Sequence, residues 1–302
     1  MKPKYIDLQV NGHGGVDLLS AKTEDEIRIV SRSLYKNGVA GYLATIITAP
    51  LEVAVKAIKL IDAVRNEPRP GEALILGIHL EGPFISLERS GVHPKEYIKT
   101  PDLNHLKSLL AAGLVRVVTI APELDGSMEL IQYLVNKDIV VSLGHSAADK
   151  TTAQKGFAFG AKTVTHIFNA MPKSTLDGLA AAAIENHDVV VQLIADGVHI
   201  SDDLLESTLP KITGRFILTN DPISAAGLGS GTFPLGNLNI EVSNGVARNQ
   251  EGTLAGGVGT LVESIERMRK FGISDSELLE SVTNRPCQLL GLNYESILKK
   301  LK

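Results

Sequence analysis

The stretch Leu74-Ile75-Leu76-Gly77-Ile78-His79-Leu80, followed directly by Glu81-Gly82-Pro83, carries the pattern that decides the fold. Its first seven positions are almost continuously apolar, which is typical of a parallel strand buried on both faces. A carboxylate then stands at the carboxyl end of the strand, where glycine and proline begin a loop. A buried strand that ends in a polar residue predicts an α/β protein with its functional site at the strand ends.

Seven further segments of this kind occur along the chain, separated by helix-length segments. The predicted strands are Tyr5–Val10, Tyr42–Thr48, Leu74–Leu80, Val115–Ile120, Ile139–Leu143, Thr163–His166, Val189–Ala195 and Arg215–Thr219. Capping-box patterns begin at Thr23 and Ser274, and Thr100-Pro101 matches an N-cap followed by a first-turn proline. Eight strands with helical connections predict a (β/α)8 barrel, with an open doubly wound sheet as the alternative.

Composition excludes several other classes of protein. The 302 residues carry 30 basic and 34 acidic side chains, a net charge of −4, and 44% of them are apolar. This balance is typical of a globular protein and offers no sign of the basic face that nucleic-acid binding needs. The single cysteine, Cys287, excludes a disulfide framework and fits a reducing compartment. Because no signal peptide or membrane-length apolar run is found, we expect a cytoplasmic protein that binds neither nucleic acid nor a membrane.

The prediction for domain organisation is a single barrel domain over residues 1–302. No repeat, low-complexity run or long linker marks a boundary within the chain. Residues 225–254 interrupt the strand–helix rhythm and are rich in glycine, proline and asparagine. We therefore expect an irregular, hairpin-rich insertion there, after the eighth strand.

Histidines gather at the ends of the predicted strands. Five of the eight histidines stand at a strand end or in the loop beyond it, namely His13, His93, His145, His166 and His199. A barrel enzyme builds its active site from these strand ends. One strand-end histidine is more often a hydrogen-bonded structural residue, but five separate structural roles would have to coincide on one rim.

Glu81, His145 and His166 stand at three of these strand ends. A carboxylate and two imidazoles match the three-ligand pattern of catalytic zinc, which leaves a fourth position for water. A metal lowers the pKa of such a water to about 7, and Asp221, at another strand end, would then act as general base and general acid. Zinc is the first choice, although iron and manganese accept the same ligands. His79 lies either beside this site or in the packing of the barrel.

Six short motifs are distributed along nearly the whole chain: Asp7–Gly12, His79–Phe84, Gly144–Ser146, Thr165–Pro172, Ala195–His199 and Thr283–Leu292. Together they resemble the N-acetylglucosamine-6-phosphate deacetylases, a family of the amidohydrolase superfamily. The resemblance implies a metal-dependent hydrolase that removes the acetyl group from an amino sugar and releases acetate. It also implies a homodimer.

The resemblance gives roles to residues by their position in the motifs. It implies that Glu81, His145 and His166 are the metal ligands, as their chemistry suggests. It implies that Asp221 is the catalytic aspartate and that His93 helps to polarise the carbonyl of the substrate. The neighbours of Asp221 differ from those usual in the family, because asparagine precedes it and proline follows it.

Substrate contacts follow from the same resemblance. It implies that His199 contacts a sugar hydroxyl, and that Asn169 and Ala170 contact the substrate's phosphate through the main chain. The next loop begins at Lys173, is shorter than in the family and lacks the arginine that holds the phosphate there. Lys173 could supply a point charge instead. The implied substrate is N-acetylglucosamine 6-phosphate, with an unphosphorylated amino sugar or another N-acyl compound as the alternative.

Strand one bears on the number of metal ions. Binuclear amidohydrolases carry His-x-His there, whereas this chain has Gln9-Val10-Asn11. An amide is a poorer ligand than a neutral imidazole, so we expect one divalent ion, and we place Gln9 and Asn11 among the substrate-contacting residues. The family also wraps a small β-sandwich around the barrel, and this chain is expected to lack it. A barrel that binds metal or sugar without catalysis remains the alternative from a different functional class.

Overall fold

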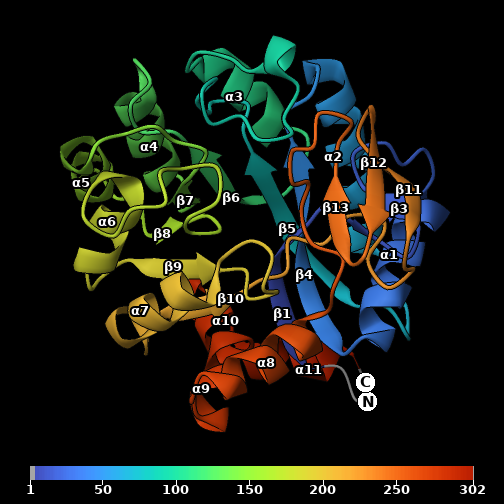
Figure 1. The fold of residues 1–302 in the computed structure, drawn as a ribbon. Coiled ribbons are helices and arrows are strands. Elements are labelled where there is room, and N and C mark those ends of the chain that lie inside the picture. Colours follow the sequence, from blue (N-terminus) through green and yellow to red (C-terminus); the bar gives the residue numbers. More distant parts are fainter. Residues whose placement is uncertain (1–3, 302) are drawn as a thin grey trace.

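Eight parallel strands, taken in chain order, form a sheet that curls into a nearly closed barrel (Figure 1). The structure, a computed structural model, describes residues 4–301. The barrel strands are β1 (Tyr5–Val10), β4 (Val39–Ile47), β5 (Leu74–Glu81), β6 (Val115–Ile120), β7 (Val140–Leu143), β8 (Thr163–Val164), β9 (Val190–Leu193) and β10 (Phe216–Leu218). Each strand pairs in parallel with the next in this series. Because the order never reverses, the predicted barrel is confirmed and the doubly wound sheet is wrong.

The barrel closes between β1 and β10 without a regular ladder. The pairings among residues 4–301 include none between these two strands. Instead, the backbone N–H groups of Asn11 and Gly12 donate to the carbonyl oxygen of Pro222, at 2.9 and 3.1 Å. The buried hydroxyl of Thr219 also donates to Oδ1 of Asp7 at 2.5 Å. The alignment of the first strand with the last therefore depends on these few bonds.

Helices surround the barrel and cover its outer face (Figure 1). They are α1 (Glu24–Lys36), α2 (Leu51–Asn66), α3 (Leu103–Leu110), α4 (Ser127–Val135), α5 (Lys150–Ala158), α6 (Gly178–Glu185), α7 (Asp202–Ile212), α8 (Leu261–Lys270), α9 (Asp275–Ser281), α10 (Asn284–Leu289), α11 (Tyr294–Lys300) and the short 3₁₀ helix η1 (Lys95–Tyr97). None of the helices within residues 4–301 combines the length and the apolar character that crossing a membrane requires.

The caps of these helices agree with the sequence in part. Thr23 forms the predicted capping box at the start of α1. Ser274 caps α9 through its hydroxyl, but the reciprocal bond is missing because the carboxylate of Glu277 pairs with a guanidinium. The predicted N-cap at Thr100 is wrong. Asp102 caps α3 instead, since its carboxylate accepts two N–H bonds of the first turn, at 2.7 and 2.9 Å.

A second apolar cluster joins the early barrel strands to the C-terminal helices. It contains Ile6 and Leu8 of β1, together with Cys287 and Leu290 from α10 and its cap. Burial raises the pKa of the Cys287 thiol to about 12, so this residue packs as a small apolar side chain. Ile6 and Leu8 alternate along β1 with the polar residues at positions 7, 9 and 11. This alternation leaves the latter residues on the opposite face of the strand.

Two short antiparallel units stand outside the barrel sheet. The strands β2 (Gly12–His13) and β3 (Val16–Asp17) form a hairpin, whose turn residues Gly14 and Gly15 have φ values of +61° and +92°. Such angles suit glycine, and they account for the glycine-rich sequence as a tight turn. Within residues 225–254, β11 (Gly231–Leu235), β12 (Leu238–Ser243) and β13 (Val246–Arg248) form a meander, drawn in orange beside β3 in Figure 1.

His13 of β2 should make the protein less stable in acid. It is buried against Ser33, with Nδ1 2.8 Å from the serine hydroxyl oxygen, and burial lowers its pKa from 6.5 to about 4. The unfolded chain therefore binds a proton between these pH values that the folded chain does not. The free energy of unfolding should fall as pH drops from 6.5 to 4, and His13 alone contributes about 3 kcal/mol to that loss.

Urea unfolding at several pH values from 4.5 to 7 measures this effect. His13→Asn should flatten the pH dependence, whereas His187→Asn, at an exposed position, should leave it unchanged. An identical pH slope in the His13 variant and the unaltered protein would contradict the assignment.

Candidate active site

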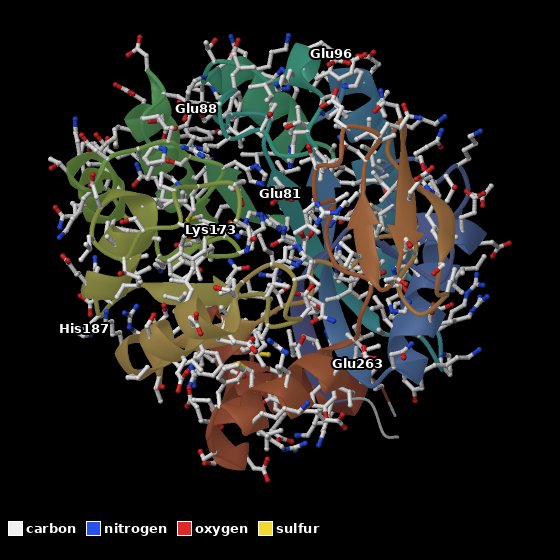
Figure 2. All side chains as sticks on the ribbon, viewed as in Figure 1. Glu81, Glu88, Glu96, Lys173, His187 and Glu263 are labelled. Atoms are coloured by element: carbon white, nitrogen blue, oxygen red, sulfur yellow. The ribbon has the colours of Figure 1, made fainter. Side chains whose placement is uncertain are left out.

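A cavity of about 290 Å³ opens at the carboxyl ends of the barrel strands. Its lining includes ten of the residues singled out from the sequence: Asn11, Glu81, His93, His145, His166, Asn169, Ala170, Lys173, His199 and Asp221. Gln9 does not line the cavity, because it is completely buried beside Glu81. Figure 2 shows Glu81 toward the middle of the molecule, while Glu96, His187 and Glu263 lie near its periphery.

Glu81, His145 and His166 approach one another closely in this cavity. Oε1 of Glu81 lies 3.1 Å from Nε2 of His145 and 2.9 Å from Nε2 of His166, and the two nitrogens are 3.2 Å apart. Ligand bonds of about 2.1 Å at tetrahedral angles would separate neighbouring ligand atoms by about 3.4 Å. The observed spacing therefore fits one metal ion. His93 adds a fourth group, with Nε2 3.8 Å from Oε2 of Glu81, and together with Glu81 and His145 it forms another set of metal-ligand type.

Hydrogen bonds on the far side of each ring distinguish His145 from His93. Nδ1 of His145 lies 2.9 Å from the carbonyl oxygen of Arg89, which only accepts, so the proton is on Nδ1 and Nε2 presents a lone pair. Nδ1 of His93 instead accepts from the backbone N–H of Thr48 at 3.3 Å. Its ring proton therefore lies on Nε2. Facing the cavity, His145 offers a ligand atom and His93 offers a hydrogen-bond donor.

Electrostatics keep these groups in the forms that such roles need. Burial lowers the pKa of His93 to about 3, so its ring is neutral at pH 7. Burial alone would raise the pKa of Glu81, but its close approach to His145 and His166 outweighs that effect and holds the pKa well below the ordinary value. Glu81 is therefore an ionised carboxylate next to two imidazole nitrogens.

Strand β1 positions both carboxylates of the site. Nε2 of Gln9 donates to Oε1 of Glu81 at 2.9 Å, and Nδ2 of Asn11 donates to Oδ1 of Asp221 at 2.6 Å. The two amides are two residues apart on one face of the strand, so each serves one carboxylate. Burial, reinforced by the charge of Glu81, raises the pKa of Asp221 well above its usual value. A carboxyl group in that state is suited to exchanging protons near neutral pH.

The backbone is strained where it presents these residues. Seven residues other than glycine have positive φ in the described chain, and five of them lie at this rim: His145, His166, Phe168, Ala170 and Asp221, with φ values between +29° and +70°. Such conformations cost energy and are retained where surrounding structure imposes them, often at functional sites. The predicted strand Thr163–His166 is too long for this reason, since β8 ends at Val164 before the chain turns at His166.

His199 is fixed by its own loop and by Lys173. Nδ1 of His199 lies 2.7 Å from Oδ2 of Asp196, and Nζ of Lys173 donates to the His199 carbonyl oxygen at 3.0 Å. Burial would raise the pKa of Asp196, but its bonds to His199 outweigh that effect and lower it. The carboxylate therefore holds the Nδ1 proton, which leaves Nε2 of His199 available to another partner.

Two parts of the lining were missed by reasoning from the sequence. Arg89 lies in the loop after β5, close in sequence to His93, and its side chain was not singled out. Residues 253–256 follow β13, and they span the end of the predicted irregular stretch 225–254 and the two residues beyond it. Gly256 allows this segment to pass close to the chain after β10, because a Cβ there would be 2.8 Å from the carbonyl oxygen of Asp221. The glycine-rich sequence around position 256 was the available signal.

A parallel barrel with carboxylates and imidazoles gathered at its strand ends defines the class of metal-dependent barrel hydrolases. The model of the amidohydrolase family matches residues 1–300. A Rattus norvegicus relative named N-acetylglucosamine-6-phosphate deacetylase is 37% identical over 308 residues, which cover 97% of this chain and 75% of that protein. The chain belongs to the amidohydrolase family and, within it, to the sugar-phosphate deacetylases, as the resemblance of its motifs implied.

Two further relatives are informative. A crystal structure of N-acetyl-D-glucosamine-6-phosphate deacetylase from Mycobacterium smegmatis, in complex with N-acetyl-D-glucosamine-6-phosphate, superimposes with a TM-score of 0.89 at 32% identity and covers 96% of this chain and 77% of that one. An N-acetylgalactosamine-6-phosphate deacetylase from Escherichia coli O157:H7 is 30% identical over 305 residues, covering 99% of this chain and 80% of its own length. The relatives thus share a reaction but differ in the sugar.

Proposed function

We propose that this enzyme hydrolyses the acetamide of N-acetylglucosamine 6-phosphate to glucosamine 6-phosphate and acetate. The observation that carries the proposal is the meeting of three groups in one cavity: the Glu81–His145–His166 cluster, the N–H donor of His93 and the raised-pKa carboxyl of Asp221. Together they provide a cation site, a donor for a carbonyl oxygen and a group that exchanges protons. These are the requirements of amide hydrolysis.

Glu81, His145 and His166 are proposed to hold one divalent ion, with zinc as the first choice and iron or manganese as alternatives. Their mutual distances and the lone pair on Nε2 of His145 support this set over one that uses His93, whose Nε2 carries a proton. When bound, such an ion polarises an oxygen as a Lewis acid and lowers the pKa of a water molecule. One ion rather than two is supported by Gln9 and Asn11, which stand where binuclear enzymes carry two histidine ligands. Each of these amides donates to a carboxylate instead.

The remaining chemical steps are assigned to side chains of the cavity. Nε2–H of His93 donates to the acetyl carbonyl oxygen and stabilises the negative charge that develops there as water adds to the carbon. Asp221 takes the proton of that water and returns it to the sugar nitrogen as the C–N bond breaks. The new C–O bond leaves the acetyl group as acetate. Asn11 keeps Oδ1 of Asp221 occupied during these transfers, which leaves Oδ2 to carry the proton.

Acetate release from matched substrates tests the proposal. N-acetylglucosamine 6-phosphate should be hydrolysed with the highest kcat/KM, ahead of N-acetylgalactosamine 6-phosphate and unphosphorylated N-acetylglucosamine. The galactosamine substrate is included because the Escherichia coli relative is named for it. Hydrolysis of the unphosphorylated sugar alone would favour the alternative substrate class. Stoichiometric binding of metal and sugar without acetate release would contradict catalysis.

Metal analysis tests the number of ions. The purified enzyme should contain one equivalent of a divalent metal per chain, and removal by a chelator should abolish turnover until metal is restored. Binding titrations of the chelated protein with zinc should saturate at the same ratio. A reproducible ratio of two would contradict the proposed single site.

We also propose that the enzyme is a homodimer, as the resemblance implied, and that it is cytoplasmic, as its composition led us to expect. Sedimentation equilibrium should give about twice the chain mass of 32.2 kDa. A monomer at micromolar concentration would contradict this part of the proposal.

A further inference from the structure

The cavity is lined by carboxylate and imidazole side chains and also by two cationic side chains. Among its lining residues, Arg89 and Lys173 are the formally positive ones. Arg89 belongs to the loop between β5 and η1, and Lys173 belongs to the segment between β8 and α6. In Figure 2, Lys173 lies to one side of Glu81, and Glu88, the neighbour of Arg89, lies farther out. Both cations therefore come from loops around the opening rather than from the barrel strands.

The guanidinium of Arg89 is largely uncommitted. One nitrogen pairs with Oε1 of Glu88 at 3.0 Å, but the Glu88 side chain is 67% exposed, so this pair contributes little in water. Nε of Arg89 is buried and has no hydrogen-bond partner in the part of the chain that the structure describes. A buried donor without an acceptor is costly, and an anionic ligand would satisfy it.

The main chain of Arg89 fixes its place beside the metal-ligand cluster. Its carbonyl oxygen accepts from Nδ1 of His145, and in the same loop the N–H of Ser86 donates to the carbonyl oxygen of His145 at 2.9 Å. On the other side of this turn, the N–H of Ser146 donates to the carbonyl oxygen of Ala170 at 3.1 Å. The Arg89 loop and the segment ending at Ala170 therefore flank the same turn after β7.

The segment on that other side has the geometry of an anion cradle. Positive φ values at His166, Phe168 and Ala170 alternate with negative ones at the residues between them. The N–H groups of Ile167 and Asn169 donate to the carbonyl oxygens of Gln192 and His166, so only the end of the segment can offer adjacent N–H groups to an anion, as in a nest. The N–H groups of Ala170 and Met171 donate to no acceptor within residues 4–301.

We propose that Arg89 is the residue that recognises the phosphate of the substrate, together with the N–H groups of Ala170 and Met171 that line the same cavity, and with Lys173 as a secondary charge. The inference rests on the proposed function and names the residue that makes it selective for a phosphorylated sugar. A guanidinium suits this task because its planar fork binds two phosphate oxygens at once, whereas an ammonium is a point charge. Lys173 is also more exposed and already donates to the His199 carbonyl.

Steady-state kinetics with matched substrates test Arg89. Arg89→Met should raise KM for N-acetylglucosamine 6-phosphate by about 10- to 100-fold, the range expected when a charge-assisted hydrogen bond is lost. KM for unphosphorylated N-acetylglucosamine should stay within about twofold, and kcat for either sugar should change little. Arg89→Lys should recover only part of the loss, because lysine restores the charge without the fork. Arg69→Met, at an exposed position away from the cavity, is the matched control.

Equal effects on both sugars, or no effect on either, would overturn the proposal. So would a Lys173→Met variant that loses phosphate discrimination while Arg89→Met keeps it. Unchanged thermal unfolding and metal content should accompany Arg89→Met, and if that variant does not fold, Arg89→Lys still provides the comparison.

A binding experiment separates this inference from the proposed function. Calorimetric titration of the metal-loaded enzyme with glucose 6-phosphate and with glucose needs no turnover. The phosphorylated sugar should bind at least about 10-fold more tightly, and Arg89→Met should remove that difference. If neither acetylated sugar is hydrolysed but this pattern holds, the deacetylation proposal fails and the role of Arg89 stands. If acetate is released but the two sugars bind alike, the role of Arg89 fails alone.

Discussion

Replacing Asp221 by asparagine should lower kcat by about 10²- to 10⁴-fold, the range associated with loss of a general acid–base group. The amide cannot take a proton from water or return one to the departing nitrogen. Its oxygen can still accept the hydrogen bond that Asn11 now gives to Oδ1, so the backbone and the neighbouring cluster should keep their positions. Metal content should therefore remain normal. A normal metal content would show that the loss of activity is a defect in catalysis and not in folding or metal binding.

Acetate release and metal analysis on the same preparation measure this result. Asp188→Asn, at an exposed position, is the matched control and should behave like the unaltered enzyme. Turnover within a few-fold of that enzyme in the Asp221 variant would remove Asp221 from the mechanism.

Glu81→Gln should weaken metal binding by more than about 100-fold and remove activity with it. Altering a residue that merely supports a ligand costs about 10- to 100-fold in metal affinity, and loss of a ligand carboxylate should cost more. Nε2 of Gln9 donates to Oε1 of Glu81, and the Nε2 atoms of His145 and His166 lie within 3.1 Å of the same oxygen, so the substitution places a neutral amide where a carboxylate now faces all three side chains.

Equilibrium dialysis with zinc provides a readout that does not depend on turnover. Glu88→Gln, on the exposed part of the next loop, is the matched control and should bind metal as the unaltered enzyme does. Normal zinc affinity in Glu81→Gln would show that the ion is held elsewhere.

The sequence was sufficient to predict the barrel because each strand carries its own signal. β1 and β6 begin and end where the predicted strands Tyr5–Val10 and Val115–Ile120 begin and end. Strand ends are harder to place where function imposes an unusual backbone. Thr163–His166 has β-branched residues that favour a strand, yet β8 stops at Val164.

The candidate site was predictable to the extent that strand ends converge. Polar residues that follow parallel strands must meet at one rim, so Glu81, His145 and Asp221 could be placed together without coordinates. Which ring nitrogen of His145 carries the proton could not, because the Arg89 carbonyl that decides it lies 56 positions away in the chain. The surroundings of Gln9 could not be predicted either. Gln9 lies at the end of a predicted strand, but its side chain is buried behind Glu81 and does not line the cavity.

The seam between β1 and β10 has a consequence for how the enzyme matures. Asn11 and Asp221 are 210 positions apart, so their hydrogen bond forms only after the last barrel strand has reached the first. Contacts of such long range are late and slow events in folding. A nascent chain with seven strands would already contain Glu81, His145 and His166, but it would lack the acid–base partner. During synthesis, the three proposed metal ligands would therefore emerge before Asp221, and acetate release would require that β10 has joined β1.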